Sequence, residues 1–269
     1  MKGKLGFFFY PAASSFLNQL QQNKLTYGYA EAVDENSQEE LDAMWEEAEQ
    51  YNRDLLKNEV IVDPFDQVVD KKAGIRYYQT LDPQDNGVMG IVRIPAINVS
   101  LPIYHGTEEE VLQKAIGHLE QTSLPVGGKG THTVVSGHRG LVSAKLFTDL
   151  NLLEEGDVFY FDVLGKTLAY QVDQMKTVEP GQLEDLAIVS DKDYATLVTC
   201  TPYGINSHRL LVRGVRIPYE ATEEADGKNK VHTDTGYYFH PYELVAAAAV
   251  LILTVLMILR RRKNRKEDD

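Results

Sequence analysis

Short runs of alternating apolar and polar residues occupy the chain between residues 88 and 217, and this period is typical of β-strands. Turn-forming residues separate the runs, and residues 163–166 mark a tight hairpin. Closure into a barrel lets many short strands bury one core without exposed edges. We therefore expect a mainly β, closed or nearly closed barrel with a few helical inserts. The runs are GIVRI, VSLPIYH, THTVVSG, DVFYFDV, TLAYQVDQM, ATLVTC and RLLVRGVRI.

A different period precedes the barrel, since residues 16–58 carry apolar side chains near helical spacing with acidic side chains opposite them. Residues 31–66 hold thirteen acidic and two basic side chains, a net charge of −11. A solvated helix face explains this acidity more simply than a binding surface for a basic partner.

Residues 244–259 form an uncharged stretch of sixteen residues, LVAAAAVLILTVLMIL, followed at once by RRRKNRK. Sixteen helical residues span about 24 Å against a hydrocarbon core of about 30 Å, so aromatic and arginine side chains at the two ends must extend the span. A buried C-terminal helix is the alternative. We predict a transmembrane helix whose basic tail is cytoplasmic, which places the preceding domain outside the cell.

The predicted organisation follows from these patterns. Residues 1–17 form a short hydrophobic N-terminal stub, for which we expect a longer hydrophobic signal or anchor segment upstream of Met1. The remaining boundaries are N-terminal helices at 18–84, the β-barrel at 85–218, a linker at 219–243, the transmembrane helix at 244–259 and the tail at 260–269.

The composition argues against several classes of function. The formal net charge of −13 over 269 residues argues against nucleic acid as a partner. A single cysteine excludes an intrachain disulfide framework and a CxxC motif, and no cluster of ligands suggests a metal or another cofactor. Cys200 is therefore either an inert core thiol or a reactive group.

The position of Cys200 favours reactivity. It ends a β-like run, a turn follows, and Arg209 begins the next run. If the two runs pair as a hairpin, Cys200 and Arg209 flank one loop, although the register decides whether they share a face. A guanidinium beside a thiol lowers the thiol pKa or donates hydrogen bonds to an oxyanion, and both uses indicate nucleophilic catalysis.

A thiol nucleophile needs an acid–base partner, for which His138 is the best candidate among seven histidines. It follows a strand and lies between Gly137 and Gly140, which predicts an exposed turn. His208, next to Arg209, stays a competitor.

The segment Thr196-Leu197-Val198-Thr199-Cys200, with Arg209 nine positions later and Gly137-His138-Arg139-Gly140 upstream, resembles the signature of the sortases. The resemblance covers residues 85–218 and implies an eight-stranded β-barrel cysteine transpeptidase. It also implies that Cys200 is the nucleophile, His138 the general acid and base, and Arg209 the oxyanion or substrate-positioning residue.

Two features resemble the pilin-polymerising class C sortases: the C-terminal membrane helix and Asp63-Pro64-Phe65, which is similar to the lid of that class. The resemblance implies that Asp63 pairs with Arg209, that Pro64 stiffens the turn and that Phe65 covers Cys200. An ordinary turn is the alternative for these three residues.

The implied reaction cleaves an LPxTG-like sorting signal between Thr and Gly and joins it to a lysine amine of a pilin at the cell membrane, without a cofactor. Two alternatives stay open. A sortase of another class would attach proteins to a peptidoglycan amine, and a non-enzymatic anchored β-domain would bind surface proteins.

Overall fold

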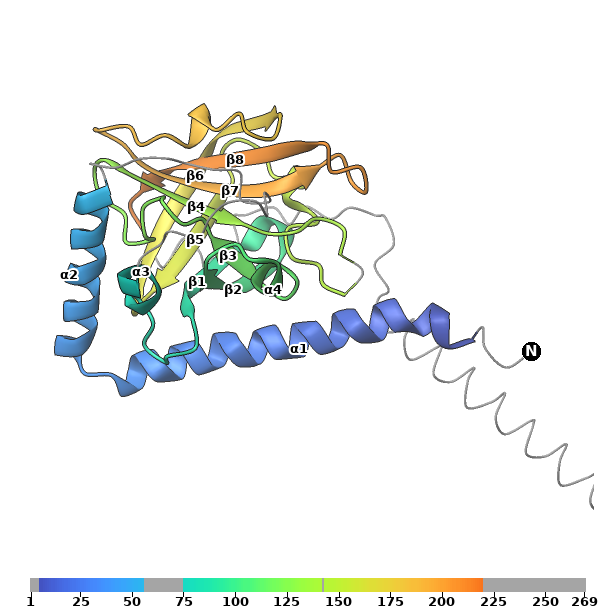
Figure 1. Cartoon of the computed structure of the whole chain (residues 1–269), viewed down its shortest axis with the longest axis horizontal. Coiled ribbons are helices and arrows are strands. Elements are labelled where there is room, and N and C mark those ends of the chain that lie inside the picture. The colour runs from blue at the N-terminus through green and yellow to red at the C-terminus, as the bar shows by residue number, and fades with distance from the viewer. Residues whose placement is uncertain (1–4, 56–74, 142, 220–269) are drawn as a thin grey trace, which may run out of the picture. The chain divides into compact units, whose positions relative to one another are not determined.

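The computed structural model describes residues 5–55, 75–141 and 143–219, and Figure 1 shows the order of their elements. Three short 3₁₀ turns and four helices accompany the strands; the helices are α1 (Leu5–Glu35), α2 (Gln38–Leu55), α3 (Ile75–Gln79) and α4 (Glu109–Leu112). The strands are β1 (Val88–Ile94), β2 (Val99–His105), β3 (Ile116–His118), β4 (Thr131–Ser136), β5 (Val158–Val163), β6 (Lys166–Val178), β7 (Asp193–Thr201) and β8 (His208–Ile217).

The strands close into one barrel in the order β1-β2-β3-β4-β7-β8-β6-β5. Neighbours are antiparallel except β2 with β3 and β4 with β7, which run parallel. The predicted fold class, a mainly β, eight-stranded barrel with N-terminal helices, is confirmed for the described residues. The seven runs of the sequence correspond to seven of the strands, and β3 is the strand that the pattern did not reveal.

Alternation along β7 separates two hydrophobic clusters. Ala195 and Leu197 belong to the main core, whereas Val198 joins a smaller cluster with Leu211 of β8 and Val134 of β4. Because successive side chains of a strand point to opposite faces, the smaller cluster lies on the outer face of the sheet. Every second residue of β7 from Thr196 onward therefore faces this outer cluster.

The predicted hairpin between β5 and β6 is present. Val163 pairs with Lys166, and Leu164 and Gly165 between them both adopt positive φ, at 45° and 76°. Two consecutive left-handed residues are what a tight two-residue hairpin requires, because their twist matches that of the flanking strands.

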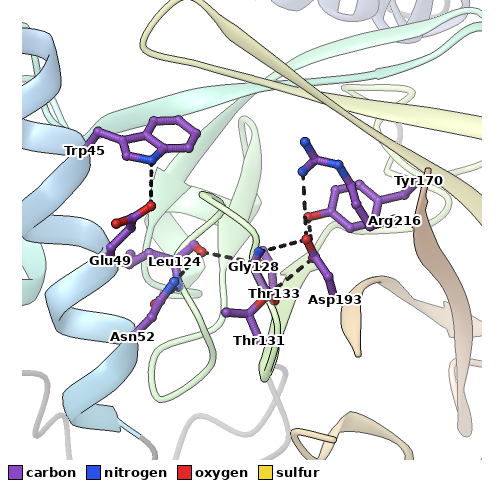
Figure 2. Close-up of polar contacts among 10 residues, drawn as sticks. All are labelled: Trp45, Glu49, Asn52, Leu124, Gly128, Thr131, Thr133, Tyr170, Asp193 and Arg216. Carbon is purple, nitrogen blue, oxygen red and sulfur yellow. Dashed lines mark hydrogen bonds and ion pairs between the residues drawn. The ribbon is translucent and has the colours of Figure 1, made fainter. Parts of the chain in front are cut away.

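Buried polar side chains attach the two long helices to the barrel. On α1, the Tyr29 hydroxyl donates to Met89 O and accepts from Leu164 N, each at 3.0 Å. On α2, the Asn52 side chain accepts from Leu124 N at 2.7 Å and donates to Leu124 O at 3.1 Å (Figure 2). Each contact satisfies buried backbone groups of the barrel, so the helices are fixed by specific polar contacts as well as by apolar packing.

Several predicted segments lie outside the described residues, namely the lid residues Asp63, Pro64 and Phe65, most of the linker, the transmembrane helix at 244–259 and the tail. Within residues 5–55, 75–141 and 143–219, no helix combines the length and apolarity needed to cross a bilayer.

Candidate active site

The register of β7 and β8 decides the position of the thiol. Cys200 pairs directly with Arg209 across the two antiparallel strands. Side chains of directly paired residues point to the same face, so the thiol and the guanidinium are neighbours on one side of the sheet. Cys200 is 7% exposed and Arg209 8% exposed, which places both in an environment of reduced solvent. The hairpin proposed from sequence therefore forms in the register that brings these residues together.

The outer face of the sheet carries this pair. Cys200 follows Val198 by two residues, and Arg209 precedes Leu211 by two. Because residues two apart on a strand share a face, Cys200 and Arg209 lie on the same face as the smaller hydrophobic cluster. The Arg209 guanidinium folds back over the loop between β7 and β8 and donates from Nη1 to Asn206 O at 3.3 Å.

His138 lies two residues beyond the end of β4. Ser136 of β4 pairs with Val198 in parallel register, and Gly137 N donates to Val198 O at 3.1 Å. His138 and Cys200 each come two residues after that pair, so the backbone brings the histidine level with the thiol. The described structure thus places the three predicted catalytic residues at the ends or starts of three adjacent strands, β4, β7 and β8.

Burial shapes the acid–base properties of His138. The side chain is half-buried, and desolvation lowers its pKa below the ordinary value, with the charge of Glu109 acting in the opposite sense. A lowered pKa leaves the imidazole neutral near neutral pH, and it makes the imidazolium a stronger acid once the ring is protonated.

Both glycines beside His138 have a structural reason. At Gly137, an added Cβ would lie 2.4 Å from the Ile116 side chain and 3.0 Å from Phe147. At Gly140, φ is +82° and an added Cβ would meet the Tyr203 ring at 2.9 Å. The turn that presents His138 can follow this course because neither position carries a side chain.

Thr199 is a supporting residue that the sequence reasoning did not single out. Its hydroxyl donates to Gly137 O at 2.7 Å, and the residue is fully buried. The bond joins the residue before Cys200 to the residue before His138. In the sequence, only the position of Thr199 inside the TLVTC segment points to a role for this residue. The carbonyl that its hydroxyl contacts is 62 residues away, too far for any local pattern to reveal the bond.

The competing histidine, His208, is placed elsewhere by strand alternation. It pairs with Thr201 and precedes Arg209 by one residue, so its side chain points to the opposite face from Arg209 and Cys200. Its Nδ1 contacts the Ser207 hydroxyl at 2.8 Å.

Other barrel histidines have structural partners. His132 contacts Ala187 O through Nδ1 at 3.1 Å and the Thr196 hydroxyl through Nε2 at 2.7 Å, and burial lowers its pKa to about 4. His105 and His118 are likewise buried and hydrogen-bonded through both ring nitrogens, and burial lowers the pKa of His118 to about 3. His118 and His132, whose pKa values burial lowers, serve the core as neutral hydrogen-bonding groups.

Comparison with known proteins agrees with this geometry. The Sortase domain family matches residues 92–217. Sortase D of Bacillus subtilis is 29% identical over 138 residues, a match covering 50% of this chain and 67% of that protein. Sortase A of Bacillus anthracis is 30% identical over 129 residues, covering 47% of this chain and 59% of that protein.

Solved structures match more of the chain. Sortase C-1 from Streptococcus pneumoniae is 46% identical with a TM-score of 0.69, covering 73% of this chain and 100% of that one. Sortase C1 of Streptococcus agalactiae is 46% identical with a TM-score of 0.67, covering 74% and 98% respectively. The shared barrel and this identity over nearly the whole of the solved chains lead to one conclusion: the protein belongs to the sortase family of cysteine transpeptidases, with sortases C among the solved structures it resembles.

Proposed function

We propose that the protein is a membrane-anchored, pilin-polymerising sortase that cleaves an LPxTG-like signal between Thr and Gly and joins the new carboxyl end to a pilin lysine. The observation that carries this proposal is the direct pairing of Cys200 with Arg209, with His138 reaching the same level from β4. The 47% identity to a Streptococcus pneumoniae sortase C, whose solved structure is described as informative on pilin substrate specificity, supports the choice of pilin substrates.

In the first step, neutral His138 takes the proton of the Cys200 thiol, and the thiolate attacks the carbonyl carbon of the threonine to form a tetrahedral oxyanion. Arg209 donates hydrogen bonds to this oxyanion, and its low exposure strengthens the interaction because little water competes. As the oxyanion collapses, the C–N bond breaks and the His138 imidazolium gives its proton to the leaving glycine amine. The product is a thioester on Cys200.

In the second step, a lysine amine attacks the thioester carbonyl. Neutral His138 removes a proton from the attacking amine, Arg209 again stabilises the oxyanion, and the C–S bond breaks to return the thiolate. The lowered pKa of His138 suits both steps, since it supplies a strong acid in the first and a neutral base in the second.

Asp63, Pro64 and Phe65 complete the proposal as a lid over the site. Asp63 would neutralise Arg209 and Phe65 would shield the thiol, while Pro64 fixes the turn between them. The elements on either side of this segment support a tethered lid. Asn52 near the end of α2 makes two hydrogen bonds to Leu124, and Tyr77 of α3 is fully buried and accepts a hydrogen bond from a barrel amide.

The apolar run at 244–259 would anchor the enzyme beside substrates that are themselves anchored to the cell surface. Holding both partners at one membrane raises their effective concentration, which favours the capture of a lysine amine over the capture of water.

The test uses the full chain in detergent with a labelled LPxTG peptide and a pilin fragment that carries the acceptor lysine. We expect a Cys200 thioester by intact-mass spectrometry and an isopeptide-linked product. Both should be absent in Cys200→Ala and His138→Ala, whereas His208→Ala, altered on the opposite face, should retain them. Faster product formation with a peptidoglycan amine than with the pilin lysine would favour wall anchoring, and no thioester with any sorting peptide would contradict the enzymatic proposal.

The lid is tested through the reactivity of the thiol. Removal of the counter-charge in Asp63→Ala should speed methanethiosulfonate labelling of Cys200, because Arg209 would no longer hold the segment over the site. Asp66→Ala is the matched control, with the same charge change three residues away, and should label at the wild-type rate. Equal rates for Asp63→Ala and Asp66→Ala would contradict the lid.

A further inference from the structure

Arg139, the residue after His138, contacts several segments around the site. Its guanidinium donates from Nε to Thr148 O at 3.1 Å, from Nη1 to the Thr201 hydroxyl at 3.1 Å and from Nη2 to Asn151 Oδ1 at 2.7 Å. One face of the group lies 5.9 Å from the centroid of the Tyr203 ring. A planar, forked group reaches acceptors in several directions at once, which the single ammonium of lysine cannot reproduce.

These contacts connect the two halves of the proposed catalytic pair. Arg139 follows His138 directly, and Thr201 follows Cys200 directly. The bond from the guanidinium to the Thr201 hydroxyl therefore ties the turn after β4 to the end of β7, just beyond the last paired residues of those two strands.

A second set of bonds stiffens the turn itself. Phe147 N donates to His138 O at 3.2 Å, and Gly140 N donates to the Thr148 hydroxyl at 3.2 Å. With the Arg139 bond to Thr148 O, three consecutive residues of the turn are each held by the 147–148 segment. Arg139 also reaches the strand that carries the thiol, through the Thr201 hydroxyl.

The acceptors of Arg139 are all uncharged: a carbonyl, a hydroxyl and a side-chain amide. A lysine substitution preserves the positive charge and removes the fork, so it separates the geometric role of Arg139 from its charge.

We propose that Arg139 is a positioning residue that sets the distance and orientation between His138 and Cys200, through its bond to Thr201. This inference rests on the proposed function, because the pair that it positions is the proposed catalytic pair. Misplacing a reacting group by about 1 Å costs on the order of 100-fold in rate. Arg139 would thus contribute to kcat without touching the substrate.

The experiment compares Arg139→Lys, Thr201→Val and the double variant in the peptide-to-lysine transfer assay. Arg139→Lys should lower kcat by about 10- to 100-fold with KM within about twofold. Thr201→Val, which keeps the branched shape and removes one acceptor, should lower kcat by about 5-fold, as expected for one hydrogen bond. The double variant should be no slower than Arg139→Lys, because the two residues act through one bond.

Arg93→Lys is the matched control, since Arg93 also uses a forked guanidinium, here against the carboxylate of Asp162 on the β1–β5 side of the barrel. It should leave kcat unchanged. A second readout, the pH dependence of Cys200 labelling by a methanethiosulfonate, needs no turnover. Arg139→Lys should shift this profile relative to the wild type and Arg93→Lys should not, because a coupled thiol and imidazole titrate according to their separation.

Two failures are distinguishable. A wild type that transfers no peptide contradicts the proposed function, and the labelling profiles then decide the positioning role by themselves. A wild-type labelling profile in Arg139→Lys, a loss confined to KM, or losses that add in the double variant would overturn the positioning role. If Arg139→Lys does not fold, the same kinetic and labelling measurements are made on Thr201→Val and Asn151→Leu, each of which removes one acceptor of the Arg139 guanidinium.

Discussion

The two ends of strands β4 and β7 differ in what their side chains do. At the starting end, Thr131 pairs with Asp193, whose carboxylate accepts hydrogen bonds from Gly128 N at 2.7 Å and from the Tyr170 hydroxyl at 3.0 Å (Figure 2). Arg216 of β8 lies 3.9 Å from the same carboxylate. At the other end, the same two strands deliver His138 and Cys200 to the candidate active site.

Strands β4 and β7 thus have one end that stabilises the fold and another end that carries the proposed catalytic residues. The starting end is closed by side chains whose polar groups bond to one another, so it holds the strands in register. The site end is held by groups other than the proposed catalytic side chains, such as Gly137 N with Val198 O, the Thr199 hydroxyl with Gly137 O and the Arg139 guanidinium with the Thr201 hydroxyl. Functional groups require a rigid support of this kind.

The largest expected effect is at the site end. In Gly137→Ala, the new Cβ would lie 2.4 Å from the Ile116 side chain and 3.0 Å from the buried Phe147 ring. We expect the closely packed core to resist and the turn that carries His138 to shift. We expect kcat/KM to fall by about 100-fold and the free energy of unfolding to fall by about 2 kcal/mol. Steady-state transfer kinetics and urea unfolding measure the two.

Asp193→Asn provides the control at the opposite end. The amide replaces one of the two acceptor oxygens by a donor, which would face either Gly128 N or the Tyr170 hydroxyl, at a cost of about 2 kcal/mol in stability. Activity of the folded fraction should stay near the wild-type value. If Asp193→Asn lowered kcat/KM as much as Gly137→Ala at equal stability, the two ends would not be functionally separate.

Local patterns in the sequence were enough to predict much of this arrangement. Alternation gave the strands, and the spacing of Cys200 and Arg209 around one turn predicted the hairpin, whose register the structure then supplied. The three residues of β3 were missed, because a strand that short carries no readable period. The α1 helix begins at Leu5 and runs through Pro11, inside the stretch that the sequence suggested was a separate stub.

The supporting contacts were beyond the reach of the sequence for a physical reason. Asn52 with Leu124 and Asp193 with Gly128 join residues 72 and 65 positions apart. No local propensity or period indicates which amide will meet which carbonyl across such a distance. Residues that perform chemistry are recognisable by type and spacing, whereas residues that position them are defined by the fold.

The smallest expected effect concerns His132, which lies at the starting end beside Tyr194 of β7. Burial lowers its pKa to about 4, whereas the unfolded chain titrates near the ordinary value of about 6.5. The unfolded state therefore binds more protons as the pH falls below 6.5, and the stability present above that pH is progressively lost until the folded ring itself protonates near pH 4.

From about pH 7 to about pH 5.5, the contribution of His132 should fall by about 1 kcal/mol. Urea unfolding of the wild type and of His132→Gln over this range measures it, and the stability curve of the variant should be flatter by that amount. His118, whose pKa is lowered to about 3, adds a similar slope in both proteins and cancels in the comparison. Since His132 lies at the starting end of the strands, kcat of the folded enzyme should not change with pH in parallel with this loss of stability. If kcat fell in parallel in the wild type but not in His132→Gln, protonation at the starting end would affect the active site, and the two ends would not be functionally separate.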